Sequence, residues 1–217
     1  MTSVASAIRA ALLTADPFAK VRATRDVARR WRRRELAFAF EVAMPDRPAR
    51  PDRPLLLPPN AMPKRGKAQS LKGRIALLHA IAHIEFVAID LALDMAGRFG
   101  GELDESFTGD WLAVAADEAM HFALLARRLA ALGNSYGDLP AHNGLWEAAH
   151  ATRHDLAARL AIVPMVLEAR GLDVTPAMIE RTRFAGAKPP PGFSNAFLRT
   201  KSAMCAAAHR GLPKYAR

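Results

Sequence analysis

The sequence DEAMHF, residues 117–122, places a glutamate and a histidine three residues apart, at Glu118 and His121. Apolar residues recur around this pair at intervals of three and four, which predicts a helix from about residue 109 to residue 132 with one buried face; they include Trp111, Val114, Leu125 and Leu132. Glu118 and His121 share that face, so we expect both to point into the core. Burying a carboxylate costs free energy unless it is paired or binds a cation. The segment therefore predicts a metal site or a buried ion pair.

The preceding segment also carries an acidic residue in a buried position. Residues 71–99 have helical periodicity and end at a Gly-Gly pair, a common C-terminal stop. Glu85 lies on the apolar stripe of this helix, and His79 and His83 flank it on a different line of the helix surface. We expect these histidines to make hydrogen bonds around the site or contacts between helices, rather than to bind a metal directly.

Residues 143–170 predict a third long helix, and Glu168 borders its apolar stripe. Pro164 removes one backbone hydrogen bond and should bend this helix one turn before Glu168. His154 faces the same way but lies 14 residues earlier, about 21 Å along the axis. It therefore cannot complete a site at Glu168.

The composition is that of a soluble globular protein. The chain has 217 residues, 51% of them hydrophobic, and no uninterrupted apolar run of membrane-spanning length. Its one cysteine, Cys205, excludes an intrachain disulfide and fits a reducing cytoplasm. No signal peptide is expected, because Arg9 and Asp16 interrupt the N-terminal apolar stretch. No glycine-rich phosphate loop or nucleophile motif occurs. We expect a cytoplasmic protein with no membrane partner.

The net charge of +10 is concentrated in parts of the chain. Residues 181–217 hold eight basic and no acidic residues, which leaves 23 basic and 21 acidic residues before them. Helices are expected at 4–14 and 17–42, and the second contains the basic segment 20–34 around Trp31. This segment has two interpretations: a solvated helix face with an inward tryptophan, or a surface that grips RNA phosphates and stacks a base.

Residues 45–63 hold seven prolines and cannot form a helix or a central strand. We expect an extended strap across the domain, because Leu55, Leu56 and Leu57 are too apolar for a free linker. The predicted organisation is thus an N-terminal helical segment, a proline-rich strap, a helical bundle and an atypical basic tail, at 1–44, 45–70, 71–184 and 185–217.

These motifs resemble a known family. Three successive predicted helices carry a glutamate, a Glu-x-x-His pair and another glutamate. This order of residues is similar to the ferritin-like di-iron arrangement. Three strings and the proline strap resemble a bacterial ferritin-like family of unknown function, itself similar to the di-iron tRNA hydroxylases; the strings are HAIAHIEFVAIDLALD (79–94), DEAMHFALLARRL (117–129) and GLWEAAHATRHDLAARLAIVPMVLEARGLDVTP (144–176). The resemblance covers about residues 6–184.

The resemblance implies an all-α fold, a ferritin-like antiparallel four-helix bundle with N-terminal helices and a strap. It implies iron as the cofactor and assigns four metal ligands, Glu85, Glu118, His121 and Glu168. Metal-bound histidines are typically oriented by carboxylates outside the ligand set. The candidates for this role are Asp90, Asp94 and Asp155.

The C-terminal segment departs from the family pattern. The fourth helix should supply a second Glu-x-x-His, but Glu180 is the last acidic residue of the chain, and His209 has no acidic neighbour. We interpret this helix as altered or incomplete and hypothesise a frameshift near residues 181–187, since a one-nucleotide shift can turn codons for residues 200–205 into a Glu-x-x-His. Coding DNA incompatible with that shift would refute the hypothesis. As written, the chain offers three carboxylates and one histidine, enough for one loosely held metal.

The predicted function is that of a di-iron carboxylate protein, an oxygen-dependent oxidoreductase or hydroxylase. The alternative is a non-catalytic helical bundle that binds RNA or a protein partner through segment 20–34, with its buried carboxylates paired to arginine or histidine. Iron storage is a third interpretation, for which the sequence offers no shell-forming surface. One fold hosts many chemistries, so the substrate, electron donor and oligomeric state do not follow.

Overall fold

Helices make up the regular secondary structure of the described part of the chain. The computed structural model describes residues 1–63 and 70–161, so the predictions on Pro164, Glu168 and the tail lie outside the described residues. The helices are α1 (Val4–Leu12), α2 (Pro17–Arg32), α3 (Leu71–Phe99), α4 (Glu105–Ala130), α5 (Gly144–Ala151) and α6 (Leu156–Leu160), with short 3-10 helices η1 (Pro59–Ala61) and η2 (Gly100–Glu102). No strand occurs in the two described ranges, which confirms the all-α class for this part of the chain.

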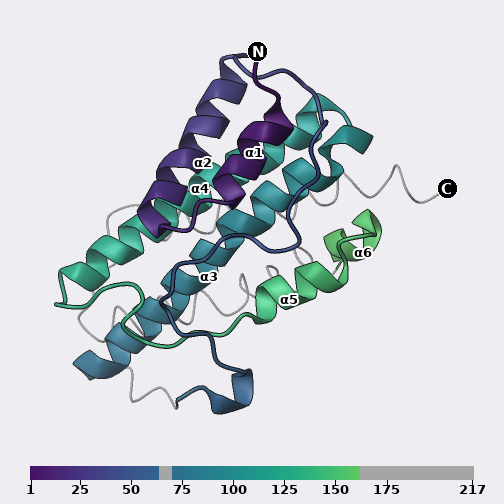
Figure 1. The fold of residues 1–217 in the computed structure, drawn as a ribbon. Coiled ribbons are helices and arrows are strands. Elements are labelled where there is room, and N and C mark those ends of the chain that lie inside the picture. Colours follow the sequence, from purple (N-terminus) through teal and green to yellow (C-terminus); the bar gives the residue numbers. More distant parts are fainter. Residues whose placement is uncertain (64–69, 162–217) are drawn as a thin grey trace.

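Helices α3 and α4 form the centre of the fold, with α1 packed on α3 and α2 packed on α4 (Figure 1). The η2 turn reverses the chain, so that α4 runs back along α3. Asp104 caps α4 by accepting a hydrogen bond from the Phe107 amide, and α4 therefore begins at Glu105, a turn earlier than expected. The four helices share one apolar core, which includes Ile8, Val27, Phe86, Trp111 and Phe122.

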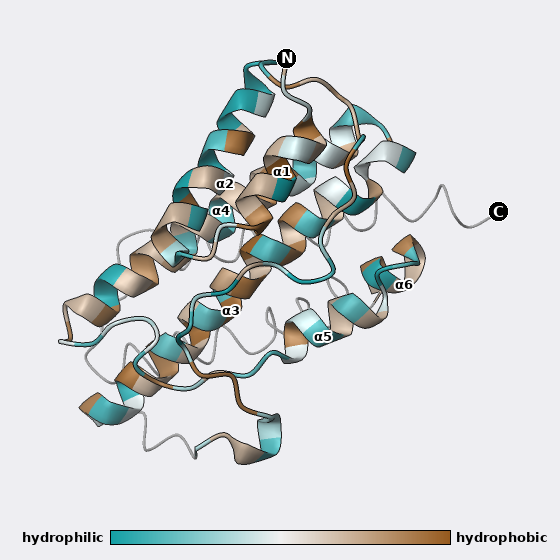
Figure 2. Cartoon of the chain, viewed as in Figure 1, coloured by the Kyte–Doolittle hydropathy of each residue, from teal (hydrophilic) through white to brown (hydrophobic). Residues whose placement is uncertain are grey.

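Helix α3 is buried although it is apolar enough to cross a membrane. The stretch Leu71–Glu102 has the length and composition of a membrane span, but 67% of its most apolar window is buried inside the protein. Figure 2 shows apolar residues along the length of α3, whereas hydrophilic residues are prominent on α2. The long apolar run is accounted for by packing against α1 and α4, as in a core helix.

Helix α2 ends ten residues before the predicted boundary at residue 42. Arg34 has a φ of 57°, a left-handed conformation that cannot continue the helix. The following segment is held in extended form by the start of the chain, because the Val4 amide donates to the Ala37 carbonyl and the Ala37 amide donates to the Thr2 carbonyl. The prediction of one helix over 17–42 is therefore wrong after Arg32.

The predicted helix from residue 143 is interrupted between α5 and α6. The hydroxyl of Thr152 donates to the carbonyls of Ala148 and Ala149 at the end of α5. Asp155 then starts α6 by accepting from the Ala158 amide. These side chain to backbone bonds compete with helical continuation, so the two short helices replace the first part of the continuous one.

The proline-rich strap crosses α3, as expected (Figure 1). It is attached by polar contacts, since Arg98 donates to the Pro45 carbonyl and Arg50 lies 3.0 Å from Asp90. The side chains of Leu55 and Leu56 do not hold the strap, since they are 64% and 38% exposed. Its backbone is held here instead, because the Leu57 amide donates to the Ala141 carbonyl and the Ala141 amide donates to the Leu55 carbonyl.

Candidate metal centre

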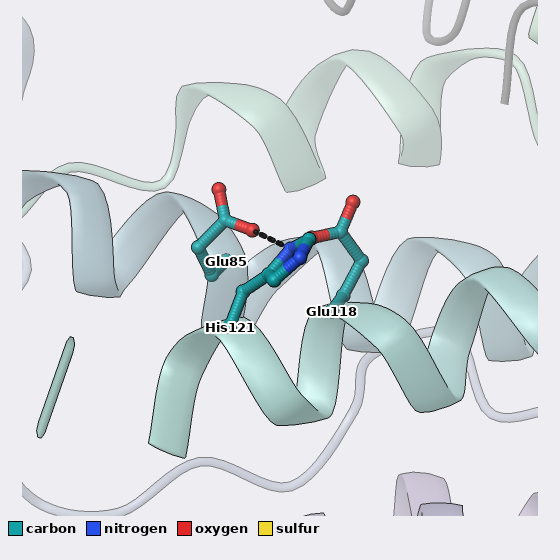
Figure 3. A group of neighbouring side chains, drawn as sticks. All are labelled: Glu85, Glu118 and His121. Carbon is teal, nitrogen blue, oxygen red and sulfur yellow. Dashed lines mark hydrogen bonds and ion pairs between the residues drawn. The ribbon is translucent and has the colours of Figure 1, made fainter. Parts of the chain in front are cut away.

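Glu85 from α3 and Glu118 and His121 from α4 point toward one another between these helices (Figure 3). His121 Nδ1 lies 3.2 Å from Glu85 Oε2 and 3.1 Å from Glu118 Oε2. All three side chains are fully buried. Each offers one ligand atom, and these atoms lie within 4.8 Å of one another. The structure thus brings three of the four predicted ligands together, while Glu168 lies outside the described residues.

Helix geometry explains how the three side chains meet. Glu118 and His121 are three residues apart and therefore share one face of α4. Glu85 lies near the middle of α3, on the side that packs against α4. The residues that follow Glu85 and His121 also meet across this interface, because the rings of Phe86 and Phe122 pack with their centroids 5.2 Å apart.

The charges of the group favour a bound cation. Burial by itself lowers the pKa of His121, but hydrogen bonds to Glu118 and Glu85 and the charges of both carboxylates outweigh it and raise the pKa to about 9. A proton on the imidazole therefore balances part of the carboxylate charge at neutral pH. A divalent metal can replace that proton, because imidazole binds metals in its neutral form.

The donor types also fit a metal ion. Two carboxylates and one imidazole, held in a site shielded from water, suit iron, manganese or zinc in the divalent state. Three donors leave further coordination positions for other ligands. The group could therefore hold a metal, and the donor set by itself admits several metals.

Asp90 has a different role from the predicted one. Among the described residues its contacts are with cations and not with a histidine: its Oδ1 accepts a hydrogen bond from Lys20 Nζ at 2.6 Å, and its Oδ2 lies 3.0 Å from Arg50 Nη1. Lys20 and Asp90 are both fully buried. Burial lowers the pKa of Lys20, and the charge of Asp90 opposes that shift. The two cations also lie over the ring of Phe86, at 5.2 Å and 5.3 Å from its centroid.

Asp94 and Asp155 likewise serve other purposes than the predicted one. Asp94 Oδ1 accepts from Arg98 Nη2 at 2.8 Å, and its Oδ2 accepts from Arg159 Nη1 at 2.6 Å. Arg159 also donates to the hydroxyl of Thr152, so one guanidinium ties the α5–α6 break to α3. Asp155 is the N-cap of α6.

His79 and His83 make contacts between α3 and the loop after α4, rather than the expected contacts between helices. His79 Nε2 accepts a hydrogen bond from the Gly137 amide at 2.9 Å. His83 Nδ1 lies 2.9 Å from the hydroxyl of Tyr136. Both imidazoles stack on the Tyr136 ring. Burial, followed by the nearby charge of Arg50, lowers the pKa of His83 to about 3, so this histidine is neutral at physiological pH.

Sequence reasoning missed the buried Lys20 and Arg159 and the partly buried Tyr136, which packs against the core. For Lys20 a signal existed, because it lies on the same helical stripe as Thr24 and Val27, which are also buried. Tyr136 stands in a short loop without periodicity. Arg159 is 1% exposed, although arginine is rarely buried without a partner. Its partner Asp94 lies 65 residues away, which no local pattern reveals.

The basic segment 20–34 divides into buried and exposed parts. Lys20 belongs to the core, whereas Arg22, Arg25, Arg29 and Arg32 are exposed. Trp31 is partly buried and packs against the core, as the interpretation of an inward tryptophan requires. The exposed arginines therefore form the available part of this segment.

The chain has been compared with known proteins and structures. Residues 13–190 match the family described as "Protein of unknown function (DUF455)". A protein of Haemophilus influenzae that bears the name "Uncharacterized protein" is 53% identical over 137 residues, which cover 60% of this chain and 47% of the relative. The chain thus spans about half the length of that curated relative. No solved structure matches it. Because the family match covers most of the sequence and includes all four predicted ligands, the chain belongs to the DUF455 family of proteins of unknown function.

Proposed function

We propose that this protein binds iron in its core and belongs functionally with the ferritin-like di-iron carboxylate oxidoreductases. The observation that carries the proposal is the fully buried group of Glu85, Glu118 and His121, whose ligand atoms lie within 4.8 Å of one another. Glu168 is the proposed fourth ligand. The packing of α3 on α4 supports the proposal, because a di-iron four-helix bundle also places a glutamate of one helix opposite a Glu-x-x-His pair of another.

The proposed ligands and the residues beside them have different roles in metal binding. Glu85 and Glu118 supply anionic oxygen ligands from opposite helices, and His121 supplies a neutral nitrogen after it gives up its proton. Phe86 and Phe122 provide apolar packing across the same helix interface. When bound, iron in such a site supplies the capacity to reduce dioxygen and oxidise a substrate. With three carboxylates and one histidine, the proposed ligand set holds one iron per chain.

The proposal is tested by counting iron. The full chain is loaded with Fe(II) without oxygen, freed of excess metal, exposed to air, and measured for iron content and absorption spectrum. We expect about one iron per folded chain, from the number of proposed donors. Two irons with an oxo-bridge absorption band would show that further ligands complete a dinuclear centre. No retained iron would contradict the proposal and favour a non-catalytic bundle.

A matched pair of variants assigns the iron to this site. Glu118→Gln keeps the shape of the side chain but removes the anionic ligand, and we expect it to abolish iron retention. Asp117→Asn makes the same chemical change at the neighbouring, exposed position and should retain wild-type iron content. Equal iron in both variants would place the metal elsewhere.

A further inference from the structure

A second feature of the molecule lies away from the proposed metal site, on the exposed side of α2. Arg22, Arg25, Arg29 and Arg32 are spaced by three, four and three residues, so they form one row along the helix. We name these four residues the arginine row. Ten residues of helix give the row a length of about 15 Å. Figure 2 shows the hydrophilic character of this helix.

The arginine row keeps most of its positive charge. In residues 1–63 and 70–161, Arg22, Arg25 and Arg32 take part in no ion pair, whereas Arg29 pairs with Asp26. Asp26 is itself 41% exposed and stands beside the row. Exposed guanidinium groups bind phosphates bidentately, so the arginine row can bind successive phosphates of a nucleic-acid backbone.

The row ends at a cleft that contains aromatic residues. The cleft has a volume of about 490 Å³ and lies between the end of α2, the segment after it and the start of α4; its walls include Trp31, Arg32, Phe38 and Gly109. Trp31 and Phe38 pack with their centroids 6.1 Å apart, and Phe38 is 39% exposed. A Cβ at Gly109 would lie 3.2 Å from Trp31 Nε1, so glycine at this position leaves room for the indole.

We infer that the arginine row and this cleft bind a single strand of nucleic acid, with phosphates on the row and one unpaired base in the cleft. Aromatic side chains stack on bases of any type, and basic side chains beside them follow the backbone. Arg32 belongs to both the row and the cleft, which makes the two surfaces continuous. Glu105 also lines the cleft, is 59% exposed and lies 3.9 Å from Arg34; its carboxylate can accept hydrogen bonds from base amino groups.

The structure favours a single strand over a duplex or a membrane. A base can enter a cleft and stack only when it is unpaired. Insertion into a bilayer would need an exposed apolar helix face, but the apolar face of α2, with Val21, Val27 and Ala28, is buried in the core. The inference is independent of iron and holds whether or not the metal site is occupied.

Binding is measured by fluorescence anisotropy with labelled oligonucleotides of about 12 nucleotides, a length within the range of known single-strand sites. The full chain is titrated with single-stranded RNA, single-stranded DNA and duplex DNA over a range of salt concentrations. We expect both single strands to bind more tightly than the duplex. Four phosphate contacts predict a slope of about −3 for log K against log salt concentration. Unequal binding of RNA and DNA would identify the natural strand.

Matched variants separate the arginine row from general basic charge. One variant changes Arg22, Arg25 and Arg32 to Gln, and the control changes three other exposed basic residues, Arg9, Lys72 and Arg127, to Gln. The basic tail is unchanged in both. We expect the first to weaken binding by at least about tenfold and to reduce the steepness of the slope by about 2. Similar losses in both variants would overturn the inference.

The cleft is tested by tryptophan fluorescence. Trp111 and Trp146 are buried, with exposures of 0% and 2%, and Trp31 is the partly exposed tryptophan. Oligonucleotide binding should therefore quench the emission of Trp31, and Phe38→Leu should weaken binding while the fold, followed by circular dichroism, is kept. Absence of single-strand binding at low salt, equal affinity for the duplex, or binding to anionic lipid vesicles in place of oligonucleotides would each overturn the inference.

Discussion

His121 Nδ1 and Glu85 Oε2 lie 3.2 Å apart in the core, although the two residues are separated by 36 positions in the chain. Glu118 completes the group from the same helix as His121. The contact sets the register of α4 against α3, because both partners are fully buried and neither can exchange the other for water. The consequences for metal binding and stability can be measured separately.

Metal binding should stabilise the fold. At a free metal concentration one hundred times the dissociation constant, a divalent ion contributes about 2.7 kcal/mol. For a chain of this size we expect Tm to rise by about 5–10 °C in anaerobic Fe(II). Glu85→Gln should abolish the increase, and Asp117→Asn should preserve it. An increase that persists in Glu85→Gln would show that the metal binds elsewhere.

Removal of the histidine should destabilise the metal-free protein. His121→Leu removes the imidazolium that both carboxylates contact, so we expect the free energy of unfolding to fall by about 3–5 kcal/mol. Replacement of Glu85, Glu118 and His121 together by Leu should recover most of this loss, because no charge then remains to be buried. Urea unfolding in the presence of a chelator measures both. A triple variant no more stable than the single one would contradict this account.

The buried ion pair at Asp90 should respond unequally to loss of its partners. Asp90→Asn leaves Lys20 and Arg50 without their shared counter-charge, and we expect a loss of about 3–5 kcal/mol. Lys20→Met should cost less, because Arg50 still neutralises Asp90 from 3.0 Å away. Urea unfolding of the two variants gives the comparison directly. Equal losses would mean that Arg50 contributes nothing to the neutralisation of Asp90.

The packing on α3 of Met44, the residue just before the strap, can be tested at Gly97. A Cβ at this position would lie 2.4 Å from Met44 Sδ and 2.9 Å from Ile8 Cγ2. We therefore expect Gly97→Ala to destabilise the protein by about 1–3 kcal/mol through overpacking. Met44→Ala in the same chain should relieve part of the crowding, so a double-mutant cycle by thermal unfolding should show positive coupling. Purely additive effects would mean that Met44 does not pack against Gly97.

Local patterns predicted the central helices well because the spacing of apolar residues reports directly which face is buried. Helix α3 matches its predicted range, and the inward faces of Glu85, Glu118 and His121 are confirmed by their complete burial. The same patterns failed where other groups compete for the backbone. Residues after Arg32 bond to the start of the chain, and the side chain of Thr152 bonds to carbonyls at the end of its own helix, α5.

The helical class, the boundaries of α3 and the donor types at positions 85, 118 and 121 follow from local sequence, because helical periodicity and side-chain chemistry are local properties. The partner of each buried charge depends instead on how the helices pack. Asp90 is paired with Lys20 from 70 residues away, and Asp94 is paired with Arg159 from 65 residues away. A buried carboxylate must be neutralised by whichever cation the fold brings within reach, and that proximity exists only once the helices and the strap have packed.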